Sequence, residues 1–178
     1  RGDADAMICG LDGRYERHLR SVRAIVGLRK EAHDYSALSL LISNRGMTFF
    51  TDTYVSMDPS ADELAEMTML AAEEIKRFGI TPKAALLSHS NFGSRQSESA
   101  AKMRAAIERL HAQAPDLMVD GEMHADSALD EKLRERVFPH SILEGEANLL
   151  VLPNLDAANI AVNAVKSMTD ALHVGPIL

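Results

Sequence analysis

Short apolar runs recur along the chain and predict strands. They cover residues 5–10, 37–43, 47–53, 83–88, 116–121 and 148–153. In the second half of the chain they alternate with helical patterns, which is typical of an α/β domain with a largely parallel sheet. Only Asn44, Arg45 and Gly46 separate runs 37–43 and 47–53, and so short a link predicts antiparallel neighbours. We therefore expect an α/β fold in which a mixed, largely parallel sheet carries helices on both faces.

Apolar spacing and capping residues predict the helices. Ser60 and Glu63 form a capping-box pattern, and the apolar residues that follow share one helical face until Gly79. Three further helices are predicted: residues 97–114, a segment opened by Ser127 and Asp130 that runs to Val137, and residues 157–170.

Polar loops follow three of the predicted strands, namely SHSNFGS at 88–94, DGEMHAD at 120–126 and PNLDAAN at 153–159. In open α/β sheets, ligands lie beyond the carboxyl ends of the parallel strands, where loops and helix amino ends meet. Exposed backbone amides at such places favour anions such as phosphate. The pattern therefore predicts the location of a site without predicting its chemistry.

The loop at 88–94 also has a purely structural explanation. Ser94 or Ser97 can serve only to cap the next helix, and Gly93 can serve only to supply a backbone conformation with positive φ. Ser88 and His89 are adjacent, so their side chains point to opposite sides of an extended segment and do not form a nucleophile with its base. A hydrolase is therefore disfavoured.

The loop at 120–126 suggests a metal site, because alternate residues Asp120, Glu122, His124 and Asp126 would supply oxygen and nitrogen ligands on one side. Their spacing matches no dedicated motif, however, and acidic residues just before a helix commonly interact with its dipole. We therefore expect no metal site formed by this chain alone.

Composition and charge narrow the class of protein. The 178 residues are 46% hydrophobic and 25% charged with a net charge of −7, which describes one soluble globular domain and argues against nucleic acid as a partner. No run is long enough to span a membrane, and the single Cys9, expected as a small buried residue at a strand end, cannot form an internal disulfide. We expect a reduced, cytoplasmic protein. Its clearest basic cluster, capable of holding one small phosphorylated ligand, is Arg14, Arg17, Arg20 and Arg23.

The order of these motifs, from DADAMICG through KAALLSHSNFGS, DLMVDGEMHAD and NLLVLPNLDAANIA to VGPIL, resembles the second lobe of phosphotransacetylases, the phosphate acetyl/butyryltransferase family. The resemblance covers nearly the whole chain. Where that family usually shows STxGS and DGPLQ, this chain has SNFGS at 90–94 and DGEMH at 120–124. Together with FFTDTYV at 49–55, these departures are similar to the carboxy-terminal domain of the large bacterial NADP-dependent malic enzymes.

The resemblance implies a division of labour within a longer protein. Residues 1–178 would be a single phosphotransacetylase-like domain fragment without its own catalysis. An amino-terminal malic-enzyme region, absent from this chain, would decarboxylate malate oxidatively to pyruvate with NADP and a divalent metal, Mg or Mn. The domain would bind acetyl-CoA, or another acyl-CoA, as an effector and help to build a homo-oligomer.

Two alternatives stay open. In the first, the chain is a lobe of a phosphate acetyltransferase, an enzyme that converts acetyl-CoA and phosphate to acetyl phosphate and CoA. In the second, the chain serves only to assemble the oligomer. The family's acetyl-transfer residues follow its GPI segment, which stands here at 175–177 near the last residue, so the resemblance implies that this chain is not a complete acetyltransferase.

The resemblance also implies a set of effector-binding residues. A guanidinium suits a CoA phosphate because it stays charged and donates in a planar fork. Arg20 falls in a segment that resembles one at the family's CoA site, although it can equally solvate one face of its helix, and Asp156 can equally cap the final helix. The candidate acetyl-CoA residues are Arg20, Asn91, Gly93, Ser94, Asn154, Asp156 and Asn159; no catalytic or metal-binding residue is assigned.

Overall fold

The computed structural model describes residues 6–30 and 32–178. These described residues fall into two compact units, one up to Asp34 and one from Tyr35 to Leu178. The prediction that residues 1–178 form a single domain stays a prediction. The strand predicted at 5–10 begins outside the described residues, and residues 6–10 form no strand. The expectation of a buried Cys9 is also wrong, because this residue is exposed. A strand needs a neighbour to pair with its backbone, and the apolar run alone does not supply one.

The first unit contains helix α1, Tyr15–Ile25. Leu19 and Val22 are three residues apart and share one face of the helix, whereas Arg17 and Arg20, also three apart, share another. Leu19 and Val22 are half-buried, whereas Arg20 is exposed. Arg23 donates to Asp34 over 3.4 Å, which ties the helix to the end of the unit.

The second unit is built on a six-stranded sheet with the order β4-β3-β5-β2-β1-β6. Strands β4, β3, β5 and β2 are parallel, and β1 is antiparallel to both of its neighbours. This confirms the predicted mixed, largely parallel sheet and the predicted hairpin. Strand β6 was not predicted, because its LHVGPI sequence contains Gly and Pro and lacks regular alternation. The strands are β1 Leu38–Ser43, β2 Gly46–Thr51, β3 Lys83–Leu87, β4 Met118–Met123, β5 Leu149–Val151 and β6 Leu172–Ile177.

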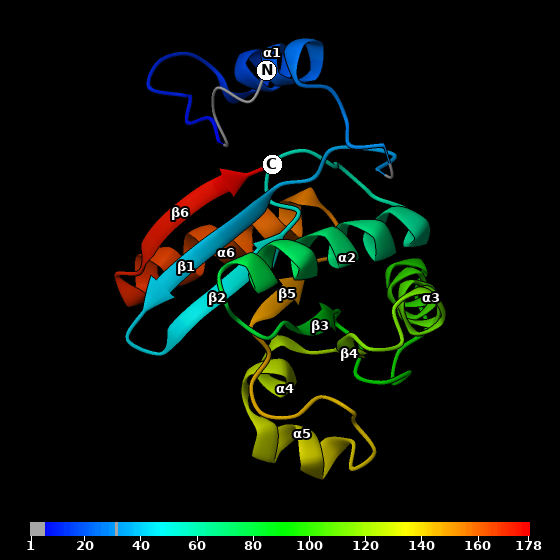
Figure 1. The fold of residues 1–178 in the computed structure, drawn as a ribbon. Coiled ribbons are helices and arrows are strands. Elements are labelled where there is room, and N and C mark those ends of the chain that lie inside the picture. Colours follow the sequence, from blue (N-terminus) through cyan, green and yellow to red (C-terminus); the bar gives the residue numbers. More distant parts are fainter. Residues whose placement is uncertain (1–5, 31) are drawn as a thin grey trace. The chain divides into compact units, whose positions relative to one another are not determined.

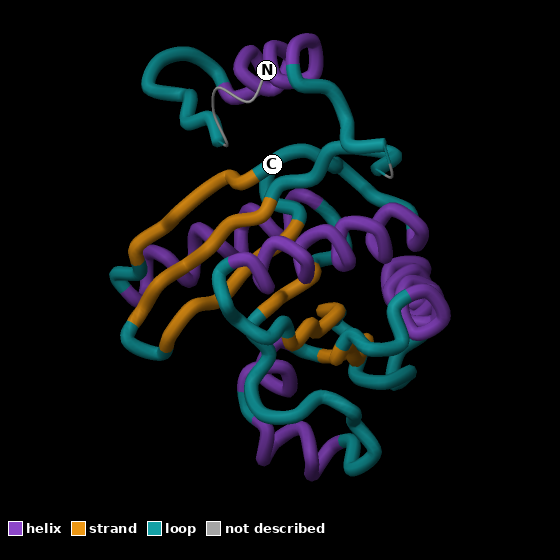
Figure 2. Tube along the Cα trace, in the orientation of Figure 1, coloured by secondary structure: helices purple, strands orange, loops and turns teal. Residues whose placement is uncertain are grey.

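Helices cover both faces of the sheet (Figures 1 and 2). Helices α2, Ala61–Arg77, and α3, Glu98–Gln113, pack on one face, whereas α4, Ala125–Leu129, and α6, Leu155–Thr169, pack on the other. Successive strand residues therefore belong to different cores, as side chains that alternate across a sheet require. In β3, for example, Leu86 joins the first core and Leu87 the second.

The helix predicted from Ser127 to Val137 is two helices. Helix α4 ends at Leu129, and α5, Glu131–Val137, begins after Asp130, whose side chain accepts a hydrogen bond from Leu133 N over 3.0 Å. Asp130 is therefore the cap of α5, and Ser127 lies inside α4 instead of opening a helix. The apolar spacing misled because Arg134, and not Val137, is the residue that α5 buries.

The amino end of α2 has both hydrogen bonds of the predicted capping box. Ser60 Oγ accepts from Glu63 N over 3.3 Å, and the Glu63 carboxylate accepts from Ser60 N over 2.7 Å. We expect Ser60→Ala to lower the free energy of unfolding by about 1 kcal/mol. Urea denaturation would measure this loss, with the exposed Ser167→Ala as control; equal stability of the two variants would contradict it.

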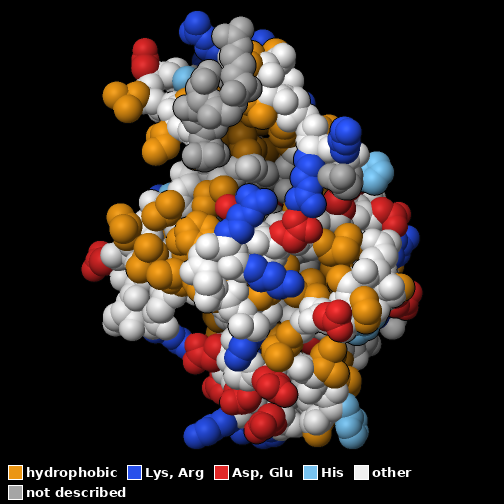
Figure 3. Space-filling view, in the orientation of Figure 1, with side chains coloured by type: hydrophobic (Ala, Val, Ile, Leu, Met, Phe, Trp, Pro, Cys, Tyr) orange, Lys and Arg blue, Asp and Glu red, His pale blue; other side chains and the backbone are white. Residues whose placement is uncertain are grey.

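Strand β6 forms one edge of the sheet and presents apolar side chains to solvent. Leu172 is 64% exposed, and Val174 and, at the end of α6, Met168 are also exposed. Figure 3 shows hydrophobic side chains gathered over this edge. Among the described residues, no helix is both long enough and apolar enough to cross a membrane.

Candidate functional site

The four parallel strands, β4, β3, β5 and β2, have their carboxyl ends on the same side of the sheet, at right angles to the edge formed by β6. Between β3 and β5 the connections diverge, because α3 follows β3 on one face and α6 follows β5 on the other. Such a switch point is where ligands bind in open α/β sheets. The loops after β3 and β5 are two of the polar loops singled out in the sequence.

The loop between β3 and α3 is folded by its own polar atoms. Ser97 Oγ accepts from Ala100 N over 3.1 Å and caps α3, and Gly93 has a φ of 83°, so both structural roles predicted for this loop are confirmed. Ser94 Oγ accepts from Asn91 N over 2.9 Å and so does not cap the helix. Phe92 also has a positive φ, 46°, and its ring stacks on Phe138 with 3.9 Å between centroids.

Ser88 and His89 have separate partners. Ser88 Oγ accepts from Ser90 N over 3.1 Å, whereas the His89 ring lies 3.3 Å from Ser97 Oγ. The imidazole is thus engaged away from the Ser88 hydroxyl, as expected for adjacent residues of an extended segment. This geometry does not form a nucleophile and base.

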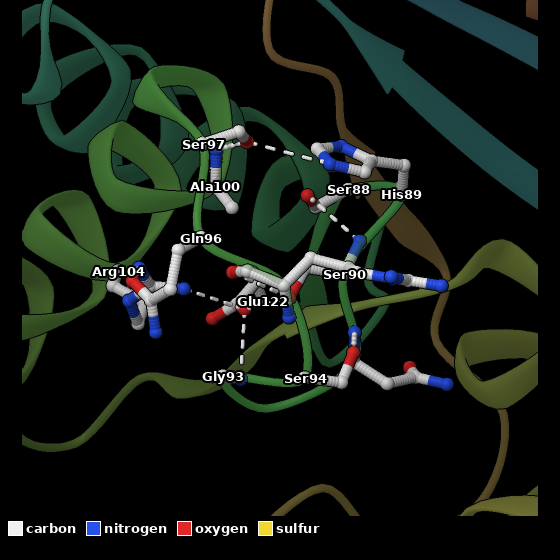
Figure 4. A network of polar contacts seen from close by, with 12 residues as sticks. Ser88, His89, Ser90, Gly93, Ser94, Gln96, Ser97, Ala100, Arg104 and Glu122 are labelled. Carbon is white, nitrogen blue, oxygen red and sulfur yellow. Dashed lines mark hydrogen bonds and ion pairs between the residues drawn. The ribbon is translucent and has the colours of Figure 1, made fainter.

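The central polar contact of the site is a buried carboxylate, that of Glu122 at the end of β4. Its Oε1 accepts three hydrogen bonds, from Ser90 Oγ over 2.6 Å, Gly93 N over 2.9 Å and Arg104 Nη1 over 2.9 Å (Figure 4). Arg104, on α3, also donates to Gln96 over 3.2 Å. The carboxylate therefore joins the β3–α3 loop, strand β4 and helix α3.

Main-chain contacts hold the same loop against β4. Phe92 N donates to Glu122 O over 2.7 Å, and Ser88 N donates to Met123 O over 2.9 Å. Asn91 adds a side-chain contact, because its Oδ1 accepts from His124 N over 2.7 Å. The loop is consequently positioned by bonds that do not depend on the Glu122 carboxylate.

Glu122 is ionised at neutral pH for a definite reason. Burial disfavours the charge and alone would raise the pKa, but the hydrogen bonds from Ser90 and Gly93, together with the charge of Arg104, outweigh burial and lower the pKa of Glu122. A carboxylate that accepts charge-assisted and backbone hydrogen bonds favours its charged form in this way.

The lowered pKa predicts how stability depends on pH. In the unfolded chain Glu122 binds its proton at a higher pH, so its contribution is complete above the unfolded pKa and is lost as pH falls through the lower folded pKa. We expect Glu122→Gln to lower the free energy of unfolding by about 2 kcal/mol near pH 7 and by less near pH 3. Urea denaturation at both pH values, with exposed Glu108→Gln as control, would measure this; a difference independent of pH would contradict it.

Asp120 is engaged apart from Glu122. Its Oδ2 accepts from Ser141 Oγ over 2.6 Å and from Ile142 N over 3.0 Å, which fastens the segment before β5 to β4. Between the two carboxylates stands Gly121, with a φ of 142°. A Cβ atom at this position would lie 2.6 Å from Leu86 O on β3, so the backbones of β3 and β4 approach too closely here for any other residue.

The second group of predicted ligand residues lies at the amino end of α6. Asn154 Oδ1 accepts from Ala157 N over 2.9 Å and caps the helix, which begins two residues earlier than predicted. The alternative in which Asp156 is the cap is therefore wrong, and Asp156 is exposed in the first turn. Asn159 donates to Thr53 O over 3.4 Å.

Lys102, which was not predicted from the sequence, connects three segments near the carboxyl ends of the parallel strands. From α3 its Nζ donates to Asp58 Oδ1 over 2.5 Å and to Pro153 O over 2.8 Å. The loops after β2 and β5 are thereby held to the helix that follows β3. Neither Lys102 nor Arg104 has a motif, because each is recognisable only from partners that are distant in sequence.

The structure thus brings together Asn91, Gly93 and Ser94 in one loop, and places Asn154, Asp156 and Asn159 on the neighbouring connection. Arg20 lies in the first unit, on α1. Effector binding by these seven residues stays a prediction. The carboxylate network around Glu122 was not predicted. Glu122 was considered only as a candidate metal ligand, and the apolar run predicted at 116–121 ends one residue before it, whereas β4 continues to Met123.

The fold and its loops define an open α/β lobe of the phosphotransacetylase type. A phosphotransacetylase from Streptococcus pyogenes superposes with a TM-score of 0.89 and 30% identity over 94% of this chain and 52% of its own. The chain belongs to the phosphate acetyl/butaryl transferase family, whose model matches residues 1–178. This confirms the resemblance inferred from the motifs.

Several relatives that are much longer than this chain are named as malic enzymes and not as phosphotransacetylases. The chain is 68% identical over 178 residues to an NAD-dependent malic enzyme of Rhizobium meliloti, covering 100% of this chain and 23% of the relative. It is 51% identical to an NADP-dependent malic enzyme of Salmonella typhimurium, covering 100% and 24%. Identity to an NADP-dependent malic enzyme of Rhizobium meliloti is 33%, covering 99% and 23%. The chain thus spans about a quarter of the length of these malic enzymes.

Proposed function

We propose that this chain is the phosphotransacetylase-like part of a malic enzyme whose remaining part decarboxylates malate oxidatively to pyruvate. The observation that carries the proposal is the 68% identity, over all 178 residues, to a protein named as an NAD-dependent malic enzyme. In the proposal, the dinucleotide and a divalent metal, Mg or Mn, bind to the remainder of the full-length protein.

NAD is the dinucleotide that we expect the full-length protein to use. The sequence motifs alone suggested NADP. Two malic enzymes of one organism, Rhizobium meliloti, are named for different dinucleotides, and this chain is 68% identical to the NAD-dependent one but 33% identical to the NADP-dependent one. A ratio of kcat/KM for NAD over NADP below one would contradict this expectation.

The role proposed for this chain is recognition of an acyl-CoA effector without bond-making. Acetyl-CoA would bind one conformation of the assembled enzyme better than another, and it can shift malate oxidation only by that difference in affinity. A product formed downstream of pyruvate would then restrain its own supply. The polar loops at the switch point, and the basic face of α1, support this proposal chemically.

The test is the rate of malate oxidation by the full-length protein, with NAD and with NADP, in the presence and absence of acetyl-CoA. We expect inhibition, with the apparent KM for malate raised roughly fivefold or more at saturating effector. Arg20→Ala should weaken the inhibition, whereas the control Arg77→Ala, an exposed arginine at the end of α2, should not. Malate kinetics that ignore acetyl-CoA would contradict the regulatory role.

The S. pyogenes phosphotransacetylase, with its TM-score of 0.89, favours a second candidate, a lobe of a phosphate acetyltransferase. Formation of acetyl phosphate from acetyl-CoA and phosphate by the full-length protein, without malate oxidation, would establish this candidate in place of the first.

A homo-oligomer is the last element of the proposal. The exposed Met168 and Leu172 at the β6 edge are apolar side chains of the kind that assembly buries. Sedimentation of the full-length protein tests this, since a monomer at micromolar concentration would exclude a stable assembly.

A further inference from the structure

The three donors around Glu122 form a set that proteins use to bind anions. A hydroxyl from Ser90, a backbone amide from Gly93 and a guanidinium from Arg104 converge on a single carboxylate oxygen over 2.6 to 2.9 Å. Backbone amides in loops with positive φ, and arginine side chains, bind phosphate and carboxylate groups of ligands in the same way. Here the chain itself supplies the anion (Figure 4).

Burial shows which part of this set a ligand can reach. The Glu122 side chain is 1% exposed, whereas that of Arg104 is 29% exposed. The second oxygen of Glu122, Oε2, is buried and accepts no hydrogen bond from the described residues. An anion arriving from solvent would therefore meet Arg104 first and find its Nη1 already bonded to an internal carboxylate.

The donors have other bonds that hold them without the carboxylate; Arg104, for example, also donates to Gln96 over 3.2 Å. The main-chain bonds from Phe92 N to Glu122 O and from Ser88 N to Met123 O fasten the loop to β4, and Arg95 N donates to Ser90 Oγ over 3.0 Å. None of these bonds involves the carboxylate of Glu122. Removal of that group would leave a hydroxyl, an amide and a guanidinium directed at one point inside the protein.

We propose that the β3–α3 loop and Arg104 form an anion site that the chain fills with its own Glu122, so that a ligand phosphate binds these donors only by displacing that side chain. The contact is autoinhibitory. It implies that the phosphates of an anionic effector are held elsewhere while Glu122 is in place. The inference does not depend on which reaction the full-length protein catalyses.

The test compares phosphate binding by wild type and Glu122→Ala, each in the full-length protein. Isothermal titration calorimetry with inorganic phosphate, at constant ionic strength set by sodium chloride, is expected to show at least roughly tenfold tighter binding to the variant, because phosphate replaces the charged acceptor that the three donors have lost. The double variant Glu122→Ala, Arg104→Ala should lose this gain. Equal phosphate binding by wild type and the folded Glu122→Ala variant would overturn the proposal.

Glu122→Gln carries the test if Glu122→Ala does not fold. The amide keeps the volume of the side chain but removes its charge, so phosphate competes with a weaker internal ligand and should bind more tightly than to wild type. The proposal fails if the glutamine variant and wild type bind phosphate equally. It also fails if wild type binds phosphate and the single variant Arg104→Ala does not, because Arg104 would then be free to bind phosphate while Glu122 is in place.

Discussion

Gly121→Ala is expected to lower the free energy of unfolding of the second unit by about 4 kcal/mol or more. The added Cβ would lie 2.6 Å from the main-chain oxygen of Leu86, and the φ of 142° is strained for a residue with a side chain. Because Leu86 pairs with Gly121 in the sheet, the two strands would have to separate to remove the clash. Urea denaturation, followed by circular dichroism, measures the loss.

Gly79→Ala is a control that measures the cost of a positive φ at a glycine where an added Cβ meets no clash. Gly79 follows α2 with a φ of 75°, and a Cβ there would meet no atom within 4 Å. We expect this control to cost only about 1 kcal/mol, the cost of a left-handed conformation. Equal losses at both glycines would show that close approach of β3 and β4 is unimportant.

Arg134→Met is the second substitution expected to have a large effect, a loss of about 3 to 5 kcal/mol. Arg134 is 1% exposed, and its guanidinium donates to Ser127 O over 2.9 Å, Leu143 O over 2.8 Å and Gly145 O over 2.6 Å. Methionine fills similar volume but leaves these carbonyls without that donor, and an unsatisfied buried acceptor is costly. Thermal and urea denaturation would both register the loss.

Arg136→Met is the matched control, because Arg136 is an exposed arginine two residues further along the same helix. It should change stability by less than about 0.5 kcal/mol. Arg134→Lys should fall between the two, since an ammonium cannot reach several carbonyls in the plane of a guanidinium. A lysine variant as stable as wild type would show that the multiple contacts of Arg134 contribute little.

Much of the fold could be predicted because local signals agree with it. The parallel order follows from the alternation of apolar runs and helices, and the hairpin follows from the short link between β1 and β2. Ser60, Ser97 and Gly79 mark helix ends through hydrogen bonds and conformations that depend on a few neighbouring residues. Such features need no knowledge of distant contacts.

The errors arise where distant contacts decide the structure. An apolar run at 6–10 forms no strand, and β6 forms one although Gly175 and Pro176 weaken its pattern, because β1 provides its partner. Likewise, α5 buries an arginine because carbonyls from the 143–145 segment come to meet it. Apolar periodicity carries no information about either partner.

The position of the loops that form the candidate site could be predicted, but their contacts could be predicted only in part. Loops 88–94 and 153–159 do lie at a switch point of the sheet, and Gly93 has the positive φ that its loop suggested. The pair Glu122 and Arg104 could not be predicted, since one residue sits on a strand and the other on a helix with no shared periodicity. Their contact exists only once β3, β4 and α3 are assembled.

The position of β5 has a consequence for synthesis on the ribosome. This three-residue strand lies between β3 and β2, yet it is made after both of them and after β4. Until residues 149–151 emerge, the backbone amides and carbonyls of β2 and β3 that pair with β5 in the folded sheet have no partner within the chain there. Unpaired edges invite association with other chains. The sheet can therefore be completed only after β5 has been synthesised, because this short strand joins the β3–β4 pair to the β1–β2 hairpin.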